Sequence, residues 1–279
     1  MSYSEIEKII LQDDTRGMAT LYENIEKGYI ERSTDLIMEK RGVVFITTGF
    51  YILSAKSSET DGPPGAIALG NTLEKLGFEV FYITDKFSYK IISGMSDEKK
   101  VIEFPISSHF DSNAFANELI KNYDPKSIIS IERAGLSKDG KYRNFRGIDF
   151  SKFNAKVDYL FEQHPKTIGI LDGGNEIGSG NYINEIENIG NIIKYPSIIT
   201  TSESIISSTS NWGAYGLIAG ISLHEKKNLL PTVKDGIKLI EKAYNLGAVE
   251  GMSGESKPWV DGRSLDEDKV CLEKLNALI

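Results

Sequence analysis

The stretch Thr167–Glu176 reads Thr-Ile-Gly-Ile-Leu-Asp-Gly-Gly-Asn-Glu. Its first five residues form a mostly apolar run, which is typical of a buried parallel strand. Asp172 follows at the end of this strand, and the two glycines after it let the backbone turn sharply. Glu176 is expected in the first turn of a helix. Because open α/β sheets bind ligands beyond the carboxyl ends of their strands, this stretch predicts both a fold and a site.

Runs of the same kind occur elsewhere along the chain. The other predicted strands are Val43–Gly49, Phe78–Ile83, a weaker Val101–Phe104, and Ile128–Ile131. Helical patterns follow them: one starting near Pro64, then residues 115–123, 153–161, 183–189, 212–224 and 233–244, and a last helix from a capping box at Ser264 through Leu278. This alternation predicts a three-layer α/β fold with a mostly parallel sheet and helices on both faces. We expect one domain over 1–279, with 1–40 as an N-terminal helical extension.

Composition narrows the class of protein. The chain has 279 residues and a formal net charge of −8, which argues against a nucleic-acid partner because phosphate binding requires clustered Lys and Arg. Cys271 is the only cysteine, which excludes a disulfide framework. The N-terminus lacks the basic start and apolar core of a targeting segment, so we expect a cytoplasmic protein. The apolar run Ala214–Leu223 is too short to span a membrane and predicts a buried helix. Homo-oligomerisation is left open.

Four carboxylates fall at or just beyond strand ends or in a rigid loop, and they predict a divalent-metal site. They are Asp61, Glu132, Asp172 and Glu176. Oxygen ligands of this kind suit hard cations, so Mg²⁺ or Mn²⁺ is the expected cofactor. The alternative is structural: the aspartates cap turns, Glu176 complements a helix dipole, and Glu132 forms an ion pair. Glu250 and Asp261 either close the site or belong to turns.

The sequence argues against three common kinds of site: a phosphate-binding loop, a histidine-rich zinc site and a serine nucleophile elbow. Residues 135–142 have the glycine and lysine spacing of a phosphate-binding loop, but Tyr142 stands where that loop needs Ser or Thr. The three histidines are scattered singly, which argues against a histidine-rich zinc site. Ser253 does not complete a nucleophile elbow. A site built from carboxylates remains the best-supported prediction.

Five short segments, in this order, resemble the D-glutamate cyclase family in its C-terminal domain. They are Thr60–Gly65, Ser130–Gly135, Arg146–Asp149, Asp172–Glu176 and Ser210–Gly213. The resemblance runs from about Gly42 to Gly262. It implies a carbon–oxygen lyase that cyclises D-glutamate to 5-oxo-D-proline and water, so either molecule is the expected small-molecule partner. It does not assign catalytic residues, so the roles below come from chemistry.

We hypothesise that the four carboxylates hold one ion, which acts as a Lewis acid on the γ-carboxylate of the substrate. Asp149 or an unligated Glu132 would carry protons, provided that the protein shifts the pKa of the group. Arg133 or Arg146 would anchor the α-carboxylate, because guanidinium binds carboxylate bidentately. Asn175 and Asn211 are further candidates for substrate binding. The alternatives are a Mn/Mg-dependent phosphatase that uses the same carboxylates and a metabolite-binding protein without turnover.

Overall fold

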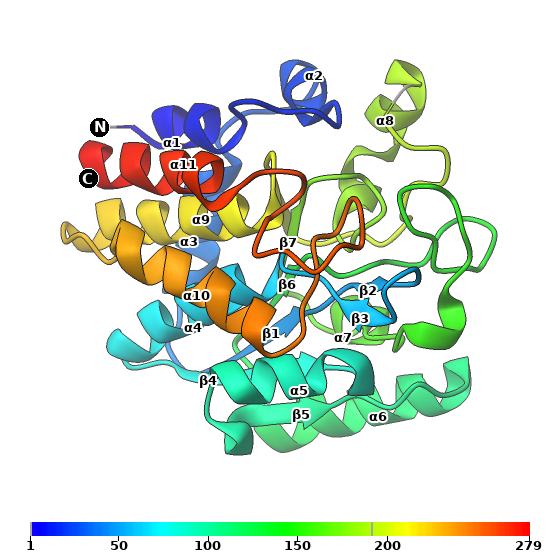
Figure 1. The fold of residues 1–279 in the computed structure, drawn as a ribbon. Helices are drawn as coiled ribbons and strands as arrows, with labels where there is room; N and C mark the ends of the chain where they lie inside the picture. Colours follow the sequence, from blue (N-terminus) through cyan, green and yellow to red (C-terminus); the bar gives the residue numbers. More distant parts are fainter. Residues whose placement is uncertain (1, 191) are drawn as a thin grey trace.

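The computed structural model describes residues 2–190 and 192–279. Its centre is a sheet of six parallel strands with helices on both faces (Figure 1). In spatial order the strands are β5 (Val101–Glu103), β4 (Glu79–Thr84), β1 (Val43–Thr48), β6 (Ser127–Ile131), β7 (Thr167–Leu171) and β8 (Glu203–Ile206). The predicted three-layer α/β fold is confirmed.

The order of these strands places the ligand-binding crevice. Counted along the chain within this sheet alone, the order is 3-2-1-4-5-6, which is the doubly wound arrangement. The chain builds outward from β1 to β5 and then returns to β6 on the other side of β1. Sheets of this kind bind ligands where the order reverses, here between the carboxyl ends of β1 and β6. Glu132 is the first residue after β6 and therefore lies at this crevice.

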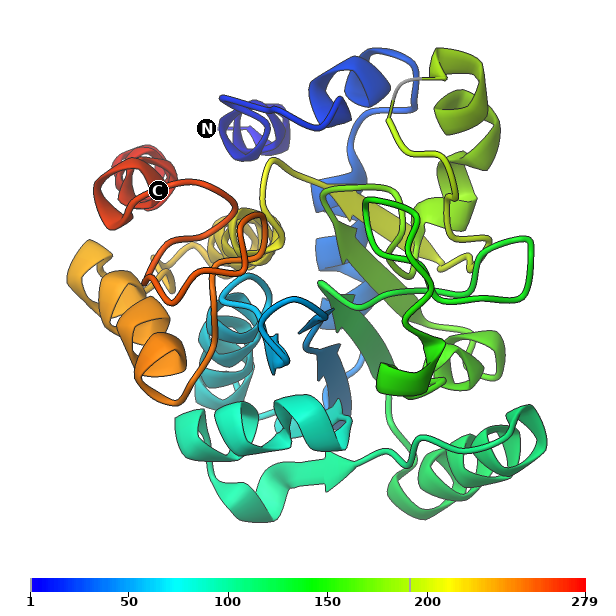
Figure 2. The ribbon, with the colours of Figure 1, turned by 45° about the vertical axis from the view of Figure 1, so that its right-hand side comes forward.

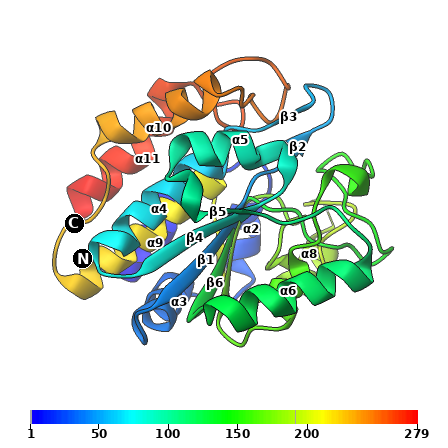
Figure 3. The same ribbon diagram turned by 90° about the horizontal axis from the view of Figure 1, so that it is seen from below.

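One face of the sheet carries the larger part of the core. Val44 and Ile46 of β1 point to this face and pack against α4 (Pro63–Lys75) and α9 (Ser210–Glu225). Helix α3 (Tyr29–Met38) packs on β8 beside α9. Three further helices pack on α4 or α9 from outside: α1 (Tyr3–Ile10), α10 (Val233–Asn245) and α11 (Leu265–Leu278). Figure 3 shows α10 and α11 outside α4 and α9. Burying one aliphatic side chain of this size contributes roughly 1.5–3 kcal/mol, and this face buries more such side chains than the opposite face.

The opposite face is thinner. Phe45 of β1 and Ile128 of β6 point to it and pack near α6 (His109–Tyr123) and α7 (Asp158–Glu162). The remaining elements lie at the edges and over the strand ends: α2 (Met18–Glu23), α5 (Lys86–Met95), α8 (Ile183–Ile189), the hairpin of β2 (Tyr51–Ile52) and β3 (Ser57–Ser58), and 3-10 turns at Glu98–Lys100, Ser151–Phe153 and Ser179–Tyr182. The loops of this set build the walls of the site.

The N-terminal region contributes to the main core. Helices α1 and α3, from the predicted extension 1–40, pack against α9, and Ile10 and Ile30 come close to Gly216. Helix α9 is buried along residues 210–222, as predicted for this apolar run. Among the described residues, the helices are all too short or too polar to cross a membrane.

The structure differs from the sequence prediction in four local features. Strand β8 and helix α5 were not predicted, and the helix expected over 153–161 is reduced to α7 and a 3-10 turn. The prediction that Glu176 begins a helix is wrong. Instead, Glu176 forms an isolated antiparallel β-bridge with Ala134. Glu176 lies three residues before the 3-10 turn Ser179–Tyr182. Gly174 and Gly178 have φ angles of 93° and 104°, and such left-handed conformations keep the chain out of a helix.

Gly169 of β7 lets the segment that carries Glu176 lie close over the sheet. A Cβ at this position would be 2.5 Å from the backbone oxygen of Ile177 and 2.8 Å from the Cα of Gly178. Backbone cannot give way as a flexible side chain can, so we expect Gly169→Ala to destabilise the protein by about 1–3 kcal/mol and to displace Glu176. Chemical denaturation measures this effect. Gly94→Ala is the control, because the three atoms nearest to its Cβ would all belong to the flexible side chain of Leu246. An equal loss of stability in this variant would contradict the explanation.

Candidate functional site

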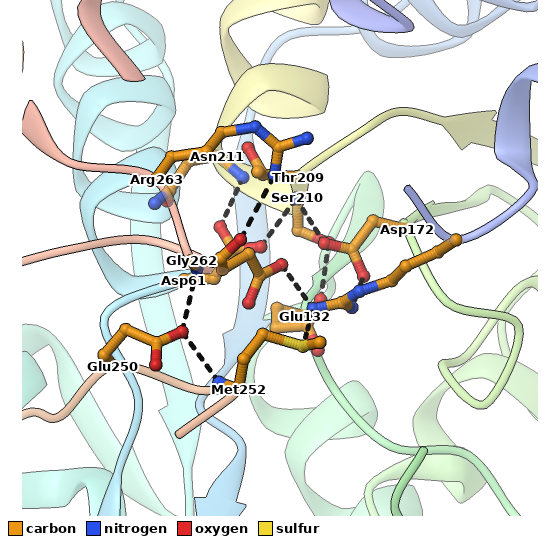
Figure 4. Close-up of polar contacts among 12 residues, drawn as sticks. Asp61, Glu132, Asp172, Thr209, Ser210, Asn211, Glu250, Met252, Gly262 and Arg263 are labelled. Atoms are coloured by element: carbon orange, nitrogen blue, oxygen red, sulfur yellow. Dashed lines mark hydrogen bonds and ion pairs between the residues drawn. The ribbon is translucent and has the colours of Figure 1, made fainter. Parts of the chain in front are cut away.

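Carboxylates from distant parts of the chain meet at the carboxyl ends of the central strands. Asp172 follows β7, Glu132 follows β6, and Asp61 lies in the loop between β3 and α4. In Figure 4 these three side chains point toward one another. Ligand atoms lie within 4.8 Å of one another in each of two groups, Asp61 with Asp172 and Asp261, and Glu132 with Asp172 and Glu176. All five side chains are buried, and Asp172 belongs to both groups.

The first turn of α9 holds three of these carboxylates. The backbone N–H of Ser210 donates to Asp61 Oδ2 at 2.8 Å and to Asp172 Oδ2 at 3.2 Å, and the N–H of Asn211 donates to Asp61 Oδ1 at 2.8 Å. The Ser210 hydroxyl donates to Glu132 Oε2 at 2.7 Å. The positive end of the helix dipole therefore faces a concentration of negative charge. Ser210 belongs to one of the five family-like sequence segments, but no role in the site was predicted for it.

Asn211, predicted to bind substrate, holds the Asp61 loop. Its Oδ1 accepts from the backbone N–H groups of Gly62 at 3.1 Å and Gly65 at 2.8 Å, and its Nδ2 donates to the carbonyl of Thr60 at 3.1 Å. Gly62 has a φ of 92°, and a Cβ there would be 2.7 Å from the Cβ of Glu132. The glycine thus allows the loop to approach the end of β6. Asn211 is completely buried and does not line the pocket beside the cluster.

Glu132 and Arg133 separate at the end of β6. Glu132 has a left-handed φ of 48°, which is unusual for a residue with a side chain, and its carboxylate turns into the cluster. Arg133 points elsewhere: it ion-pairs with Asp85 and donates to the carbonyl oxygen of Gly49 at 2.6 Å. The structure therefore brings Glu132 to the site and removes Arg133 from reach of a substrate there.

Arg16 brings a positive charge into the cluster from the loop between α1 and α2. Its Nη1 lies 2.5 Å from Asp172 Oδ1, and its Nη2 lies 2.6 Å from Asp261 Oδ2. The segment between α10 and α11, coloured orange to red in Figure 2, supplies Asp261. Glu250 shapes this segment by accepting backbone N–H bonds from Met252 at 2.8 Å and Gly262 at 2.9 Å. Of the two residues considered for closing the site, Asp261 is part of the cluster.

The cluster is crowded with negative charge. Burial raises the pKa of Asp61 to about 7, and the neighbouring Asp261 adds to this rise. Burial likewise raises the pKa of Asp261 to about 7, although Arg16 opposes the shift. The pKa values of Glu132 and Asp172 are raised well above their usual range, first by burial. Near neutral pH this cluster retains protons unless a further cation neutralises it.

A pocket of about 190 Å³ opens beside the cluster. Its charged walls are the carboxylates of Glu59, Glu132 and Glu176 and the guanidinium groups of Arg16 and Arg146. Aromatic and apolar side chains complete it, and they are Phe50, Tyr51, Ile52, Leu53, Phe145, Ile148 and Met252. The size and mixed lining suit a small charged metabolite. Glu59 was not predicted, because it lies just after a two-residue strand without a recognisable pattern.

Some of the residues predicted to bind substrate or carry protons line this pocket, and others do not. Arg146 and Asn175 line the pocket, but Asp149 does not. Asp149 is exposed and accepts from the N–H and hydroxyl of Ser151 at 3.0 and 2.7 Å, and these hydrogen bonds lower the pKa of its carboxyl. An exposed carboxylate with a lowered pKa is poorly suited to carry a proton at this site.

The chemistry of the donors fits a hard divalent cation. The ligand atoms are all carboxylate oxygens, which Mg²⁺ and Mn²⁺ prefer. Glu176 Oε2 accepts from the backbone N–H of Gly174 at 2.8 Å, whereas Oε1 is buried and has no hydrogen-bond partner among the described residues. A buried carboxylate oxygen without a donor is costly, and a cation beside it would remove that cost.

Comparison with known proteins gives the family. The sequence model of the family described as "D-glutamate cyclase-like, C-terminal" matches residues 6–276. The chain belongs to this family. Its similarity to the human protein named D-glutamate cyclase, mitochondrial, is 32% identity over 201 residues, which is 64% of this chain and 32% of the human protein. The chain therefore spans about a third of the length of that curated relative.

This D-glutamate cyclase-like chain also has weak structural similarity to a solved structure titled as an exopolyphosphatase-related protein from Bacteroides fragilis. The TM-score is 0.46 at 13% identity, over 91% of this chain and 57% of the other. A likeness this weak carries no argument about function. The family assignment agrees with the resemblance seen in the five sequence segments.

Proposed function

We propose that this chain is a metal-dependent lyase of the D-glutamate cyclase type, which converts D-glutamate to 5-oxo-D-proline and water. The observation that supports this most is the carboxylate cluster that opens into a small pocket with Arg146 on its wall. The family match and the name of the human relative favour this reaction over the phosphatase alternative.

The pocket has two regions that could bind the two ends of a dicarboxylic amino acid. Arg146 is exposed and, among the described residues, makes one hydrogen bond, from Nη2 to the carbonyl of Met252 at 3.1 Å. Most of its donors would therefore be free for the α-carboxylate. Asn175 Nδ2 donates to the carbonyl of Arg143 at 3.1 Å, which fixes the side chain and leaves Oδ1 as an acceptor for the α-ammonium. The γ-carboxylate would then lie toward Glu132 and Glu176.

The reaction joins the α-nitrogen to the γ-carbon and breaks one carbon–oxygen bond. The nitrogen loses two protons in becoming a lactam N–H, and the departing oxygen gains them to leave as water. Burial and the carboxylates of Asp172 and Glu176 raise the pKa of Glu132 well above its usual range. Glu132 can therefore hold a proton only while it is not ligating an ion. When Glu132 is a metal ligand, Glu59 would protonate the departing oxygen, because Glu59 lines the same pocket and burial raises its pKa well above its usual range.

Glu132, Asp172 and Glu176 would hold one Mg²⁺ or Mn²⁺, which when bound supplies Lewis-acid polarisation of the γ-carboxylate. The aromatic wall of Phe50, Tyr51 and Phe145 would limit access of water to the pocket. Limited water favours lactam formation over its hydrolysis.

The test is chiral chromatography of D- and L-glutamate and both 5-oxoproline enantiomers after incubation with metal-stripped protein, with and without Mn²⁺ or Mg²⁺. We expect metal-dependent interconversion within the D series alone. No conversion by folded, metal-loaded protein would reject the proposed reaction. Release of phosphate from simple esters would then favour the phosphatase, and a rise in Tm with D-glutamate without product would favour a binding protein.

Arg146→Lys tests the anchor for the α-carboxylate. A lysine keeps the charge but loses the fork, and a charge-assisted hydrogen bond contributes about 1.5–3 kcal/mol. We therefore expect KM to rise about 10- to 100-fold with a smaller change in kcat. Arg41→Lys, which changes a 57% exposed side chain paired with Glu225, is the matched control and should leave KM unchanged. An unaltered KM in Arg146→Lys would remove this residue from substrate binding.

A further inference from the structure

Arg16 occupies a position that a metal ion would otherwise suit. Its guanidinium bridges Asp172 and Asp261, at 2.5 and 2.6 Å, and its side chain is only 10% exposed. Asp61, Asp172 and Asp261 form one of the two groups whose oxygens lie close enough to ligate a common cation. The cation actually present beside this group is the arginine.

The carboxylates of the two groups differ in their hydrogen-bond and ion-pair partners. The first group is Asp61, Asp172 and Asp261, and the second is Glu132, Asp172 and Glu176. In the first group, Asp61 accepts three backbone N–H bonds, from Gly62, Ser210 and Asn211, and Asp261 pairs with Arg16. In the second group, Glu176 Oε1 is fully buried without a hydrogen-bond partner among the described residues, and it borders the pocket. Asp261 Oδ1 is also buried without a hydrogen-bond partner among the described residues, but its carboxylate already pairs with Arg16 through Oδ2, and Asp261 does not line the pocket. The second group is therefore the one with an unpartnered carboxylate oxygen on a residue that lines the pocket.

The two groups share Asp172, as the two halves of a two-metal site share a bridging carboxylate. In enzymes with two metals the ions lie about 3.5–4 Å apart and clamp the attacking and leaving oxygens of a phosphoryl group. Here the two groups also share a carboxylate, that of Asp172, but the first group already pairs with a fixed positive charge, the guanidinium of Arg16.

The protein fixes Arg16 from its own loop. The Asp14 carboxylate accepts the backbone N–H groups of Arg16 at 3.0 Å, Gly17 at 2.9 Å and Ala19 at 3.1 Å, which sets the turn before α2. The Phe145 ring lies 5.7 Å from the guanidinium carbon. An arginine held in this way keeps its place without a bound substrate.

We propose that Arg16 stands in for a second divalent ion, so that the site binds a single Mg²⁺ or Mn²⁺ through Glu132, Asp172 and Glu176. This inference rests on the metal site of the proposed function and makes it more specific. A single ion beside an arginine suits activation of one carboxylate. It does not provide the two-metal clamp used for phosphate esters.

The test is the stoichiometry of Mn²⁺ binding, measured by calorimetry and by elemental analysis after gel filtration. We expect one ion per chain in the wild type and in Arg16→Lys, which keeps the charge. In Arg16→Met, which keeps the aliphatic stem without the charge, we expect two ions. Two ions in the wild type, or one in Arg16→Met, would overturn the inference. No ion in the wild type would instead reject the metal site of the proposed function.

Two further variants keep the inference testable if Arg16→Met does not fold. Glu176→Gln changes a residue of the second group only, and Asp261→Asn changes a residue of the first group only. We expect Mn²⁺ affinity to fall at least about 10-fold in Glu176→Gln and to be retained in Asp261→Asn. The reverse pattern would place the ion in the first group and overturn the inference. Electron paramagnetic resonance of bound Mn²⁺ should show isolated ions in the wild type, and a coupled pair would also overturn it.

Discussion

In the Asp172→Asn variant we expect affinity for Mn²⁺ or Mg²⁺ to fall by at least about 100-fold, since even residues outside the ligand shell cost 10- to 100-fold when changed. Asp172 is shared by both groups of carboxylates and is completely buried. Asparagine has nearly the same shape but lacks the negative charge that attracts a cation. We expect turnover of the proposed lyase reaction at limiting metal to fall in parallel.

The variant should still fold, because the substitution removes one negative charge from a site that holds too many. Burial raises the pKa of Asp172 well above its usual range, although Arg16 opposes the shift. The variant loses the ion pair between Arg16 and Asp172, but Arg16 keeps its ion pair with Asp261. Calorimetric titration with Mn²⁺ measures the affinity, and circular dichroism checks the fold. Stoichiometric binding at wild-type affinity would falsify the role of Asp172 as a ligand.

Two matched substitutions accompany this test. Asp266→Asn changes an 88% exposed carboxylate on α11 and should affect neither metal binding nor turnover. Asp149→Asn tests a residue that was predicted from the sequence to be a proton carrier. Because Asp149 is exposed and does not line the pocket, we expect near wild-type activity, and a loss greater than about 100-fold, typical of a lost general acid or base, would restore it to the mechanism.

The sequence predicted the parts of the fold that depend on local pattern. Strands β1, β6 and β7 are apolar runs buried on both faces, so their composition distinguishes them from the amphipathic helices between them. Strand β8 has four residues and begins with a glutamate, which leaves too short a pattern to recognise. Elements at the edge of a sheet carry weaker signals for the same reason.

The sequence predicted those site residues that follow strands or lie in a loop with a recognisable pattern, and it missed the others. Asp61, Glu132, Asp172 and Glu176 follow strands or lie in a proline-fixed loop, so the rule for parallel sheets brings them together. Arg16 could not be found in this way, because it reaches Asp172 from 156 residues away and no local pattern marks it. The direction of Arg133 depends on the left-handed φ of Glu132, which no propensity predicts.

Asp268→Asn should make the protein more stable at alkaline pH. Asp268 lies in α11, is buried, and accepts from Trp212 Nε1 at 2.9 Å. Burial raises the pKa of its carboxyl to about 7, while the hydrogen bond from Trp212 opposes the shift. An asparagine can accept the same hydrogen bond through Oδ1 and has no proton to lose.

The sign follows from proton binding in the two states. The carboxyl has a pKa near 3.9 in an unfolded chain and about 7 in the folded protein, so between these values the folded state binds more protons. The free energy of unfolding therefore falls as pH rises through this window and levels off above it. The full shift corresponds to at most about 4 kcal/mol, and this contribution is absent in Asp268→Asn.

Urea denaturation near pH 5 and near pH 8 measures the difference between wild type and variant. We expect the variant to gain stability relative to wild type as pH rises, while the other buried carboxylates cancel because both proteins contain them. Asp266→Asn, on the same helix, should show no such gain, since the pKa of Asp266 is lowered by its contact with Lys269. A pH-independent difference for Asp268→Asn would show that the carboxyl is ionised throughout. Arg263, whose guanidinium lies 5.1 Å from the Trp212 ring and which donates to the carbonyl of Asp261, would then be the cation that keeps it so.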